Sequence, residues 1–303
     1  MRFVLALGAG VLSVTSAMAL DSPCDTRTVL VPVLNNKWQT LTNLKAENFS
    51  AEMNNTSLEV YRVEPGVVPR RMVLLLDTSG SMQGQKIANV KQLAIALAST
   101  AHPQTEVTAY SFDVKLRQRL GSSADLKQLA ENIRTMQAPK GRTAMRDAIL
   151  ALFAELKDLG PEDLLYLLTD AGDSTSNTSQ GDLKKRLLTS GLRLSAAIFE
   201  DPRAFTDEER YGPSELSELV TATGGFQTVF TPWDQSIGPS KDAITRQDLL
   251  VRLANHQYKL TVRTPGAIGR SQKWNLRLRN LPPEMKKFRP LYPRELPACV
   301  NTN

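Results

Sequence analysis

Runs of apolar residues alternate with amphipathic stretches through the middle of the chain. The run MVLLL at 72–76 contains no polar position, which is typical of a strand covered on both faces by helices. Between such runs apolar residues recur at intervals of three and four, as at Ile87, Val90 and Ala94, which predicts amphipathic helices. This alternation predicts a doubly wound α/β unit with a mainly parallel sheet. The six predicted strands are 72–77, 106–112, 115–120, 163–169, 192–199 and 226–230.

Alternating or β-branched patterns replace the helical spacing at both ends of the chain. Three N-terminal segments, at 28–34, 38–41 and 58–63, have strand character and are separated by Asn-Asn turn signals. Strand patterning returns at 258–264 and 273–281. We therefore expect a small β-rich region that is built from both ends and flanks the α/β unit. The predicted division of the chain is a signal peptide at 1–19, an N-terminal β segment at 20–69, the α/β domain at 70–255 and a C-terminal β segment at 256–303.

The first residues have the features of a secretory signal peptide. Met1 and Arg2 precede an apolar run at 3–14, and small residues end in Ala-Met-Ala at 17–19. Cleavage after Ala19 would leave a periplasmic or secreted protein, with an uncleaved signal anchor as the alternative. No other segment approaches the ~18 consecutive apolar residues that a bilayer-spanning helix needs. We therefore predict no stable membrane insertion.

Two cysteines, Cys24 and Cys299, stand near the two ends of the chain. In an exported protein an even pair favours a disulfide, because the compartment is oxidising. Such a bond would make the first and last segments neighbours, so that the α/β unit becomes an insertion in one flanking β domain. Two free thiols, or an intermolecular bond, are the alternatives.

The charge balance is mildly basic. The chain has 37 Lys and Arg against 31 Asp and Glu, and removal of the signal peptide with Arg2 leaves 37 − 1 = 36 against 31, a net charge of +5. Short basic clusters at 184–186 and 286–287 lack interleaved aromatic residues. They predict a solvated surface and no nucleic-acid partner, with weak attraction to anionic surfaces.

Polar side chains follow two of the buried strands. Asp77, Ser79 and Ser81 come directly after the run at 72–76, and Asp170 follows the predicted strand 163–169. Ligands of doubly wound sheets collect at the carboxyl ends of strands. Aspartate and serine before a helix are also ordinary caps and turn formers. A further hydroxyl, that of Thr143, begins a predicted helix, and oxygen ligands from three loops are what Mg²⁺ prefers.

These segments resemble a known family of domains. DTSGSM at 77–82, GRTAMRDA at 141–148 and LLTDAGD at 167–173 resemble the metal-ion-dependent adhesion site of von Willebrand factor type A domains, whose pattern is DxSxS, then Thr, then Asp. The resemblance covers roughly 70–255, and its flanks look like those of a bacterial exported family with this domain. It implies one antiparallel strand in the sheet and a bound Mg²⁺, with Mn²⁺ or Ca²⁺ as alternatives. The implied metal ligands are Asp77, Ser79, Ser81, Thr143 and Asp170.

The resemblance also implies recognition of a protein partner. Two aspartates offset the charge of the ion, and an open position would accept the carboxylate of a partner's Asp or Glu. We expect Asp173 and Ser174, with the Ser/Thr-rich loop behind them, to form the rim that selects the partner. Arg142 and Ala171 stand where the family more often has glycine, so the ligand preference is not carried over.

An enzyme is the competing class. A hydrolase that uses Asp77 and Asp170 would need a nucleophile or an acid of raised pKa, and no second motif supplies one. His102 and His256 are the two histidines, and the chain has no G-x-S-x-G elbow, P-loop or G-x-G-x-x-G. We therefore predict a binding protein without enzymatic activity. A subunit of an envelope assembly with a purely structural metal is the third alternative.

Overall fold

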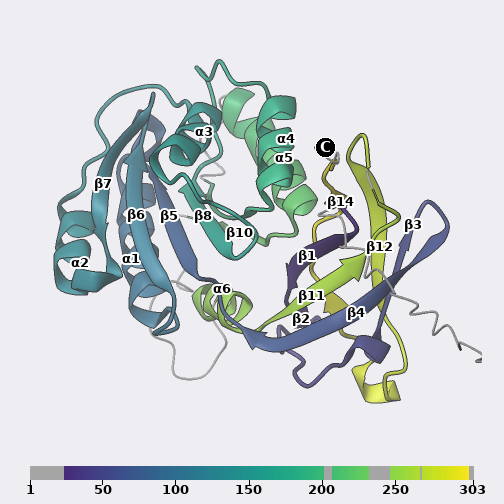
Figure 1. Cartoon of the computed structure of the whole chain (residues 1–303). Coiled ribbons are helices and arrows are strands. Elements are labelled where there is room, and N and C mark those ends of the chain that lie inside the picture. The colour runs from purple at the N-terminus through teal and green to yellow at the C-terminus, as the bar shows by residue number, and fades with distance from the viewer. Residues whose placement is uncertain (1–23, 201–206, 232–245, 267, 300–303) are drawn as a thin grey trace, which may run out of the picture.

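A computed structural model describes residues 24–200, 207–231, 246–266 and 268–299. The signal peptide predicted at 1–19 lies outside the described residues. The chain forms two parts that lie side by side, an α/β domain and a smaller β domain (Figure 1). No described helix is long and apolar enough to cross a membrane.

The α/β domain is built on a six-stranded sheet with the strand order β10-β9-β8-β5-β6-β7. Every neighbouring pair is parallel except the β6–β7 pair, which is antiparallel. The strands are β5 (Arg71–Asp77), β6 (Glu106–Phe112), β7 (Leu116–Ser122), β8 (Asp163–Thr169), β9 (Arg193–Phe199) and β10 (Gln227–Phe230). The predicted fold class is confirmed.

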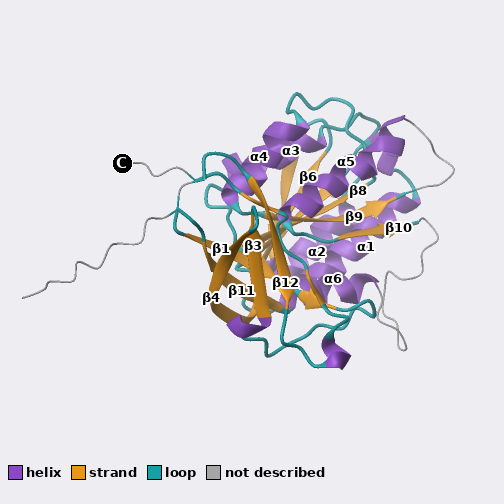
Figure 2. Ribbon diagram, turned by 90° about the vertical axis from the view of Figure 1, so that its right-hand side faces the viewer, coloured by secondary structure: helices purple, strands orange, loops and turns teal. Residues whose placement is uncertain are grey.

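Helices cover both faces of this sheet, as Figure 2 shows. The unbroken apolar run of β5 is explained by this arrangement, because Leu74 and Leu76 enter the core on one face and Val73 and Leu75 the core on the other. The helices of the first face are α1 (Gln85–Thr100), α2 (Leu126–Thr135) and α6 (Arg246–Asn255). Those of the second face are α3 (Met145–Glu155), α4 (Gln180–Ser190) and α5 (Asp207–Thr223). Short 3₁₀ turns are η1 (Ala46–Asn48), η2 (Gly80–Met82), η3 (Ser123–Asp125) and η4 (Pro283–Met285).

The β domain combines strands from both ends of the chain in an antiparallel sheet with the order β1-β11-β4-β3-β12-β14. Its strands are β1 (Thr26–Val31), β3 (Phe49–Met53), β4 (Thr56–Val67), β11 (Gln257–Arg263), β12 (Gln272–Leu278) and β14 (Glu295–Leu296). A separate pair consists of β2 (Val33–Leu34) and β13 (Arg289–Pro290). The Cys24–Cys299 disulfide is present and joins the two ends of this domain, as predicted. The predicted boundaries at 69/70 and 255/256 fall between β4 and β5 and between α6 and β11, and they stay a prediction.

At the N-terminal end one predicted strand was wrong and one strand was not predicted. The segment 38–41 is no strand, because Asn35 closes a turn there by accepting the Trp38 N–H at 3.0 Å, and only Thr40 forms an isolated bridge to Leu34. Strand β3, with the sequence FSAEM, was not predicted because it has few β-branched residues. The Asn-Asn turn signal after it was correct, since Asn54 and Asn55 both have positive φ in the hairpin between β3 and β4.

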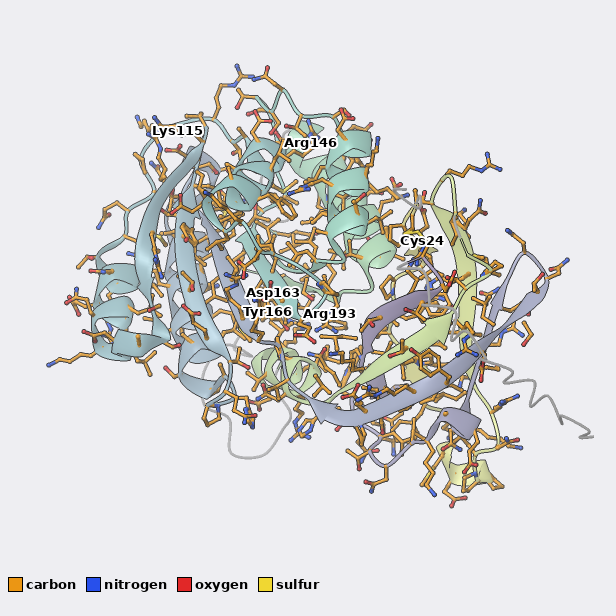
Figure 3. All side chains as sticks on the ribbon, in the orientation of Figure 1. Cys24, Lys115, Arg146, Asp163, Tyr166 and Arg193 are labelled. Atoms are coloured by element: carbon orange, nitrogen blue, oxygen red, sulfur yellow. A yellow bond between two sulfur atoms is a disulfide. The ribbon has the colours of Figure 1, made fainter. Side chains whose placement is uncertain are left out.

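Direct contacts fix the two domains to each other. Arg193 begins β9 and donates from Nη2 to Oε1 of Gln257 at 2.8 Å, and both side chains are buried (Figure 3). Gly224, just after α5, has φ 72°, and a Cβ there would lie 2.3 Å from the nitrogen of Pro293. The end of α5 therefore packs directly on the C-terminal segment of the β domain.

We predict that the disulfide contributes strongly to stability. It closes a loop with a sequence separation of 275 residues, and a cross-link over so long a loop removes ~3–5 kcal/mol of entropy from the unfolded chain. A Cys24→Ser/Cys299→Ser double variant should lose about that free energy of unfolding in urea. Reductant should lower the stability of the wild type and leave the double variant unchanged. Equal stability of the oxidised and reduced wild type would contradict this account.

Candidate metal centre

Two buried carboxylates lie at the carboxyl ends of adjacent parallel strands. Asp77 is the last residue of β5, and Asp170 directly follows β8. The register pairs Leu76 with Leu168, so Asp77 lies beside Thr169 and Asp170 follows one residue further along the same edge of the sheet. Asp77 is 0% exposed and Asp170 is 2% exposed. Sequence reasoning anticipated both positions.

The loop after β5 folds back onto the first of these carboxylates. The main-chain N–H of Ser79 donates to Oδ1 of Asp77 at 2.8 Å, and the hydroxyls of Ser79 and Ser81 lie 3.2 Å apart. Ser79 is buried, whereas Ser81 is exposed at the surface. The loop therefore presents one carboxylate and two neighbouring hydroxyls, with the outer hydroxyl accessible from solvent.

A close main-chain approach joins this loop to the one that carries Thr143. The N–H of Gly80 donates to the carbonyl of Gly141 at 3.0 Å. A Cβ at residue 80 would lie 2.9 Å from the main-chain nitrogen and oxygen of Gly141, so only glycine fits there without displacement of one loop. The glycine within DTSGS thus brings the second loop to the edge where Asp77 lies.

The main chain of Thr143 is held by the third loop. Its carbonyl accepts hydrogen bonds from the N–H groups of Ser174 and Thr175, both at 3.0 Å, and its own N–H donates to Oγ of Ser174 at 3.3 Å. Thr143 is 5% exposed. The three predicted loops are therefore tied together at one end of the sheet, while the assignment of the five side chains as metal ligands stays a prediction.

The ionised form of Asp77 is destabilised by its surroundings. Burial, and then the charge of Asp170, raise the pKa of Asp77 to about 7. Hydrogen bonds to Asp77 from the Thr169 hydroxyl, at 2.5 Å, and from Ser79 act in the opposite direction without cancelling this effect. Two carboxylates buried at neighbouring strand ends favour a bound cation, which would offset their negative charge.

Sequence reasoning missed a lysine whose positive charge offsets part of the negative charge of the two carboxylates. Nζ of Lys86 lies 3.0 Å from Oδ2 of Asp170, and the two side chains are 8% and 1% exposed. Lys86 stands in the first turn of α1, on the face that also buries Val90 and Leu93. The sequence contained a signal for this ion pair, because Lys86 stands at a core-facing position of a predicted helix and a buried lysine needs a charged partner.

The donor set fits a hard divalent cation. Within the described residues no three His, Cys, Asp or Glu side chains gather closely enough to hold a metal. An ion at this edge would therefore depend on hydroxyl oxygens beside the two carboxylates, which suits Mg²⁺ better than metals that prefer nitrogen or sulfur.

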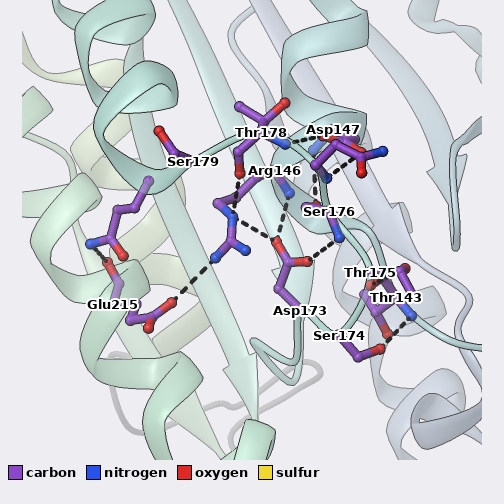
Figure 4. A network of polar contacts seen from close by, with 12 residues as sticks. Thr143, Arg146, Asp147, Asp173, Ser174, Thr175, Ser176, Thr178, Ser179 and Glu215 are labelled. Carbon is purple, nitrogen blue, oxygen red and sulfur yellow. Dashed lines mark hydrogen bonds and ion pairs between the residues drawn. The ribbon is translucent and has the colours of Figure 1, made fainter.

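The predicted rim residues serve the loop itself (Figure 4). Asp173 has a side chain that is 5% exposed, and it accepts the N–H groups of Arg146 at 3.0 Å and Ser176 at 3.2 Å. It therefore caps the start of α3. Ser174 accepts from Thr143, and its carbonyl accepts Nη2 of Arg142 at 2.7 Å. Direct contact of Asp173 or Ser174 with a partner stays a prediction.

Ala171 occupies a position that favours glycine. Its φ is 67°, in the left-handed region, where a side chain is strained. A Cβ at Gly212 of α5 would lie 2.0 Å from the carbonyl oxygen of Ala171, so the helix approaches this peptide closely. Ala171 therefore adopts the left-handed backbone that glycine would adopt without strain.

The exposed charges on the loops of the site are positive. In the described loop segments 78–84, 113–118, 137–144 and 171–178, the two aspartates are buried or have their oxygens occupied within the fold. The charged side chains of these segments that are exposed are all cations. They are Lys115, Arg117, Lys140 and Arg142.

Both histidines lie away from this edge. His102 lies between α1 and the start of β6, and His256 directly precedes β11. The starts of the parallel strands, including β6, lie at the opposite edge of the sheet from Asp77 and Asp170. His256 also lies near that opposite edge, because the next residue, Gln257, contacts Arg193 at the start of β9. Neither histidine is therefore placed to activate Ser79 or Ser81.

We predict an unusual pH dependence of stability in the absence of divalent cations. The folded protein holds a proton on Asp77 up to about pH 7, whereas the unfolded chain loses it near pH ~4. The free energy of unfolding should therefore fall as the pH rises through this window, and stay low above it. An Asp77→Asn variant should lack the fall and exceed the wild type in EDTA at about pH 8 by at least ~1 kcal/mol.

Urea unfolding in EDTA across this pH window is the measurement. A Glu155→Gln variant, which changes an exposed carboxylate on α3, should follow the wild type. Parallel pH profiles of wild type and Asp77→Asn would show that Asp77 does not titrate in this way.

Several solved structures are similar to parts of this chain. A von Willebrand factor type A protein from Catenulispora acidiphila is 12% identical, with a TM-score of 0.46, and the match covers 92% of this chain and 75% of that one. The protein BatB from Bacteroides thetaiotaomicron is 16% identical, with a TM-score of 0.44 over 53% of this chain and 90% of that one. Proximal thread matrix protein 1 from the mussel byssus, with a zinc-occupied MIDAS motif, is 16% identical, with a TM-score of 0.47 over 67% and 50%.

A curated relative is the inter-alpha-trypsin inhibitor heavy chain H4 of Sus scrofa. It is 25% identical over 130 residues, which are 40% of this chain and 14% of the relative's length. The chain thus spans a small part of that protein. The family model of the von Willebrand factor type A domain matches residues 72–173, which include the five predicted metal ligands but only the start of the third loop. Residues 72–173 of this chain are therefore similar to a von Willebrand factor type A domain.

Proposed function

We propose that the protein is an exported binding module that recognises a protein partner through a divalent cation, Mg²⁺. Asp77, Ser79, Ser81, Thr143 and Asp170 would hold the ion, and a carboxylate of the partner would complete its coordination. When bound, the ion supplies an electrophilic position for an acidic side chain. The observation that carries the proposal is the pair of buried carboxylates, Asp77 and Asp170, at the loops that also carry the three hydroxyls.

The charge balance of the site explains why a bound ion would still attract an acidic partner. Two carboxylates neutralise a dication formally, and hydroxyl oxygens add no further negative charge, so a bound ion keeps affinity for an additional anion. Lys86 lies against Asp170, and its positive charge would give the site with a bound ion a net positive charge. We propose that Lys86 balances the site when no ion is bound and gives up its contact with Asp170, or shares it, when an ion binds.

The surrounding surface also favours an acidic partner. Lys140 and Arg142 are exposed in the loop that carries Thr143, and Lys115 is exposed at the same end of the sheet (Figure 3). Opposite charges speed the encounter between partners and disfavour wrong ones. We propose these cations as the rim of the site, together with Ser174, while Asp173 contributes by holding the loop in place.

The metal and the partner are tested separately. Saturating Mg²⁺, at a hundred times its dissociation constant, should stabilise the mature chain against EDTA by about 2.7 kcal/mol. A Thr143→Val variant keeps the main-chain bonds to Ser174 but loses the hydroxyl, and we expect its affinity for Mg²⁺ to fall about tenfold. Thr100→Val, at the far end of α1, is the control. An equal thermal shift with Mg²⁺ in all three proteins would show that the Thr143 hydroxyl does not bind the ion.

A short peptide with one aspartate, and its twin with asparagine, test the partner chemistry. NMR titration should show shifts in the loops 78–84 and 137–144 with the aspartate peptide only, and only with Mg²⁺ present. Thr143→Val should weaken this response in proportion to its loss of metal. Responses that persist in EDTA or with the asparagine peptide would contradict coordination of a carboxylate, even where the metal itself binds.

A separate prediction concerns Lys86. Lys86→Met leaves Asp170 buried without its partner, so the free energy of unfolding in EDTA should fall by ~3–5 kcal/mol. The same change removes a competing cation, so the affinity for Mg²⁺ in calorimetry should rise about tenfold or more. Lys91→Met, on the same helix, should change neither quantity substantially. An unchanged or weaker affinity in Lys86→Met would show that the lysine does not oppose the ion.

A further inference from the structure

The net charge of the protein is concentrated in one short stretch of the β domain. Residues 270–290 contain seven cations and one carboxylate, that of Glu284, so this stretch has a net charge of 7 − 1 = +6. The whole chain has 37 basic and 31 acidic residues, which leaves 37 − 7 = 30 against 31 − 1 = 30 elsewhere. The rest of the chain is therefore neutral. The seven cations are Arg270, Lys273, Arg277, Arg279, Lys286, Lys287 and Arg289.

Folding brings four of these cations around one hollow. A hollow of about 540 Å³ lies between the end of β12 and the segment 286–290, and no carboxylate lines it. Leu278, Leu281 and Phe288, all half-buried, contribute apolar surface. The cations that line it are Arg277, Arg279, Lys286 and Arg289. Positive charge and apolar surface are thus presented together.

These cations are not neutralised within the fold. Arg279 donates from Nε to the main-chain carbonyl of Glu47, and Arg289 donates from Nη1 to the carbonyls of Lys286 and Phe288. Such bonds orient a guanidinium but leave its charge and its other N–H groups available. In the described part of the chain none of the lining cations, nor the neighbouring Lys287, forms an ion pair with a carboxylate.

The basic end lies far from the candidate metal centre. In Figure 1 the segment around η4, drawn in yellow, forms the bottom of the β domain. Lys115 and Arg146, which belong to the end of the sheet that carries the metal centre, lie at the top of the molecule in Figure 3. A surface that binds the basic end would therefore leave the metal centre open to a partner.

We propose that this basic end docks on a membrane surface that contains anionic phospholipids. Clustered lysine and arginine side chains are attracted to such surfaces, each by about fivefold in affinity, and apolar side chains beside them can enter the interface. A nucleic acid is a weaker match, because no exposed aromatic side chain accompanies the cations. Docking of this kind is peripheral and reversible.

The test uses the mature chain and sedimentation with lipid vesicles. Vesicles of phosphatidylcholine alone are compared with vesicles that also contain phosphatidylglycerol, at low and high salt. The variant Arg277→Gln/Arg279→Gln/Arg289→Gln removes three charges at the hollow. The control Lys127→Gln/Lys157→Gln/Lys185→Gln removes three exposed charges from the α/β domain. Thermal unfolding with Mg²⁺ confirms that each protein is folded.

We expect binding to the anionic vesicles only, and weaker binding at high salt. The variant at the hollow should lose about a hundredfold in affinity, whereas the control should stay close to the wild type. Equal losses in both variants would show that only overall charge matters, and would overturn the proposal. Absence of binding to the anionic vesicles, or preference for soluble glycerol phosphate, DNA or an acidic protein over them, would also overturn it.

Discussion

The repulsion between two buried carboxylates governs the functional end of this protein. Asp77 and Asp170 lie at the ends of neighbouring strands because the parallel register of β5 and β8 leaves them no other place. Burial, and then the charge of Asp170, raise the pKa of Asp77, and hydrogen bonds from neighbouring groups partly offset this effect. Thr169 and Ser79 donate hydrogen bonds to Asp77, while Lys86 contacts Asp170. A divalent ion is the group that would relieve the remaining excess of negative charge.

Main-chain contacts, more than side chains, position the rest of the site. The Gly80–Gly141 approach joins the first loop to the second, and the carbonyl of Thr143 joins the second to the third. The third loop is in turn held by the start of α3, since Asp147 accepts the N–H groups of Asn177 and Thr178. Partial burial raises the pKa of Asp147, but these hydrogen bonds outweigh it and the net pKa is lowered. Main-chain hydrogen bonds therefore connect the three loops to one another and to the start of α3.

The sequence was most informative where one strong pattern decided the structure. Strands covered on both faces, such as β8 at Asp163–Thr169, agree with the predicted bounds because every position is apolar or buried. Strand β3 was missed because it has few β-branched residues, and one of its two partner strands, β12, is distant in the sequence. Lys86 was missed for a related reason, because a lysine is assigned to the surface unless its buried partner is known. Asp173 was expected to face a partner, but its oxygens are occupied by main-chain groups whose position only the folded helix reveals.

The Cys24–Cys299 disulfide has a mechanical consequence. The α/β domain is connected to the β domain by two strand junctions, and the covalent bond joins the β domain before the first strand and after the last. A pulling force applied to the segments outside the two cysteines would pass through that bond. The metal centre, enclosed within the cross-linked loop, would carry none of the tension along the backbone. Tension between the two ends of the chain would therefore leave the loops of the candidate metal centre undistorted, whereas a force applied at those loops would be transmitted into the β domain through both junctions.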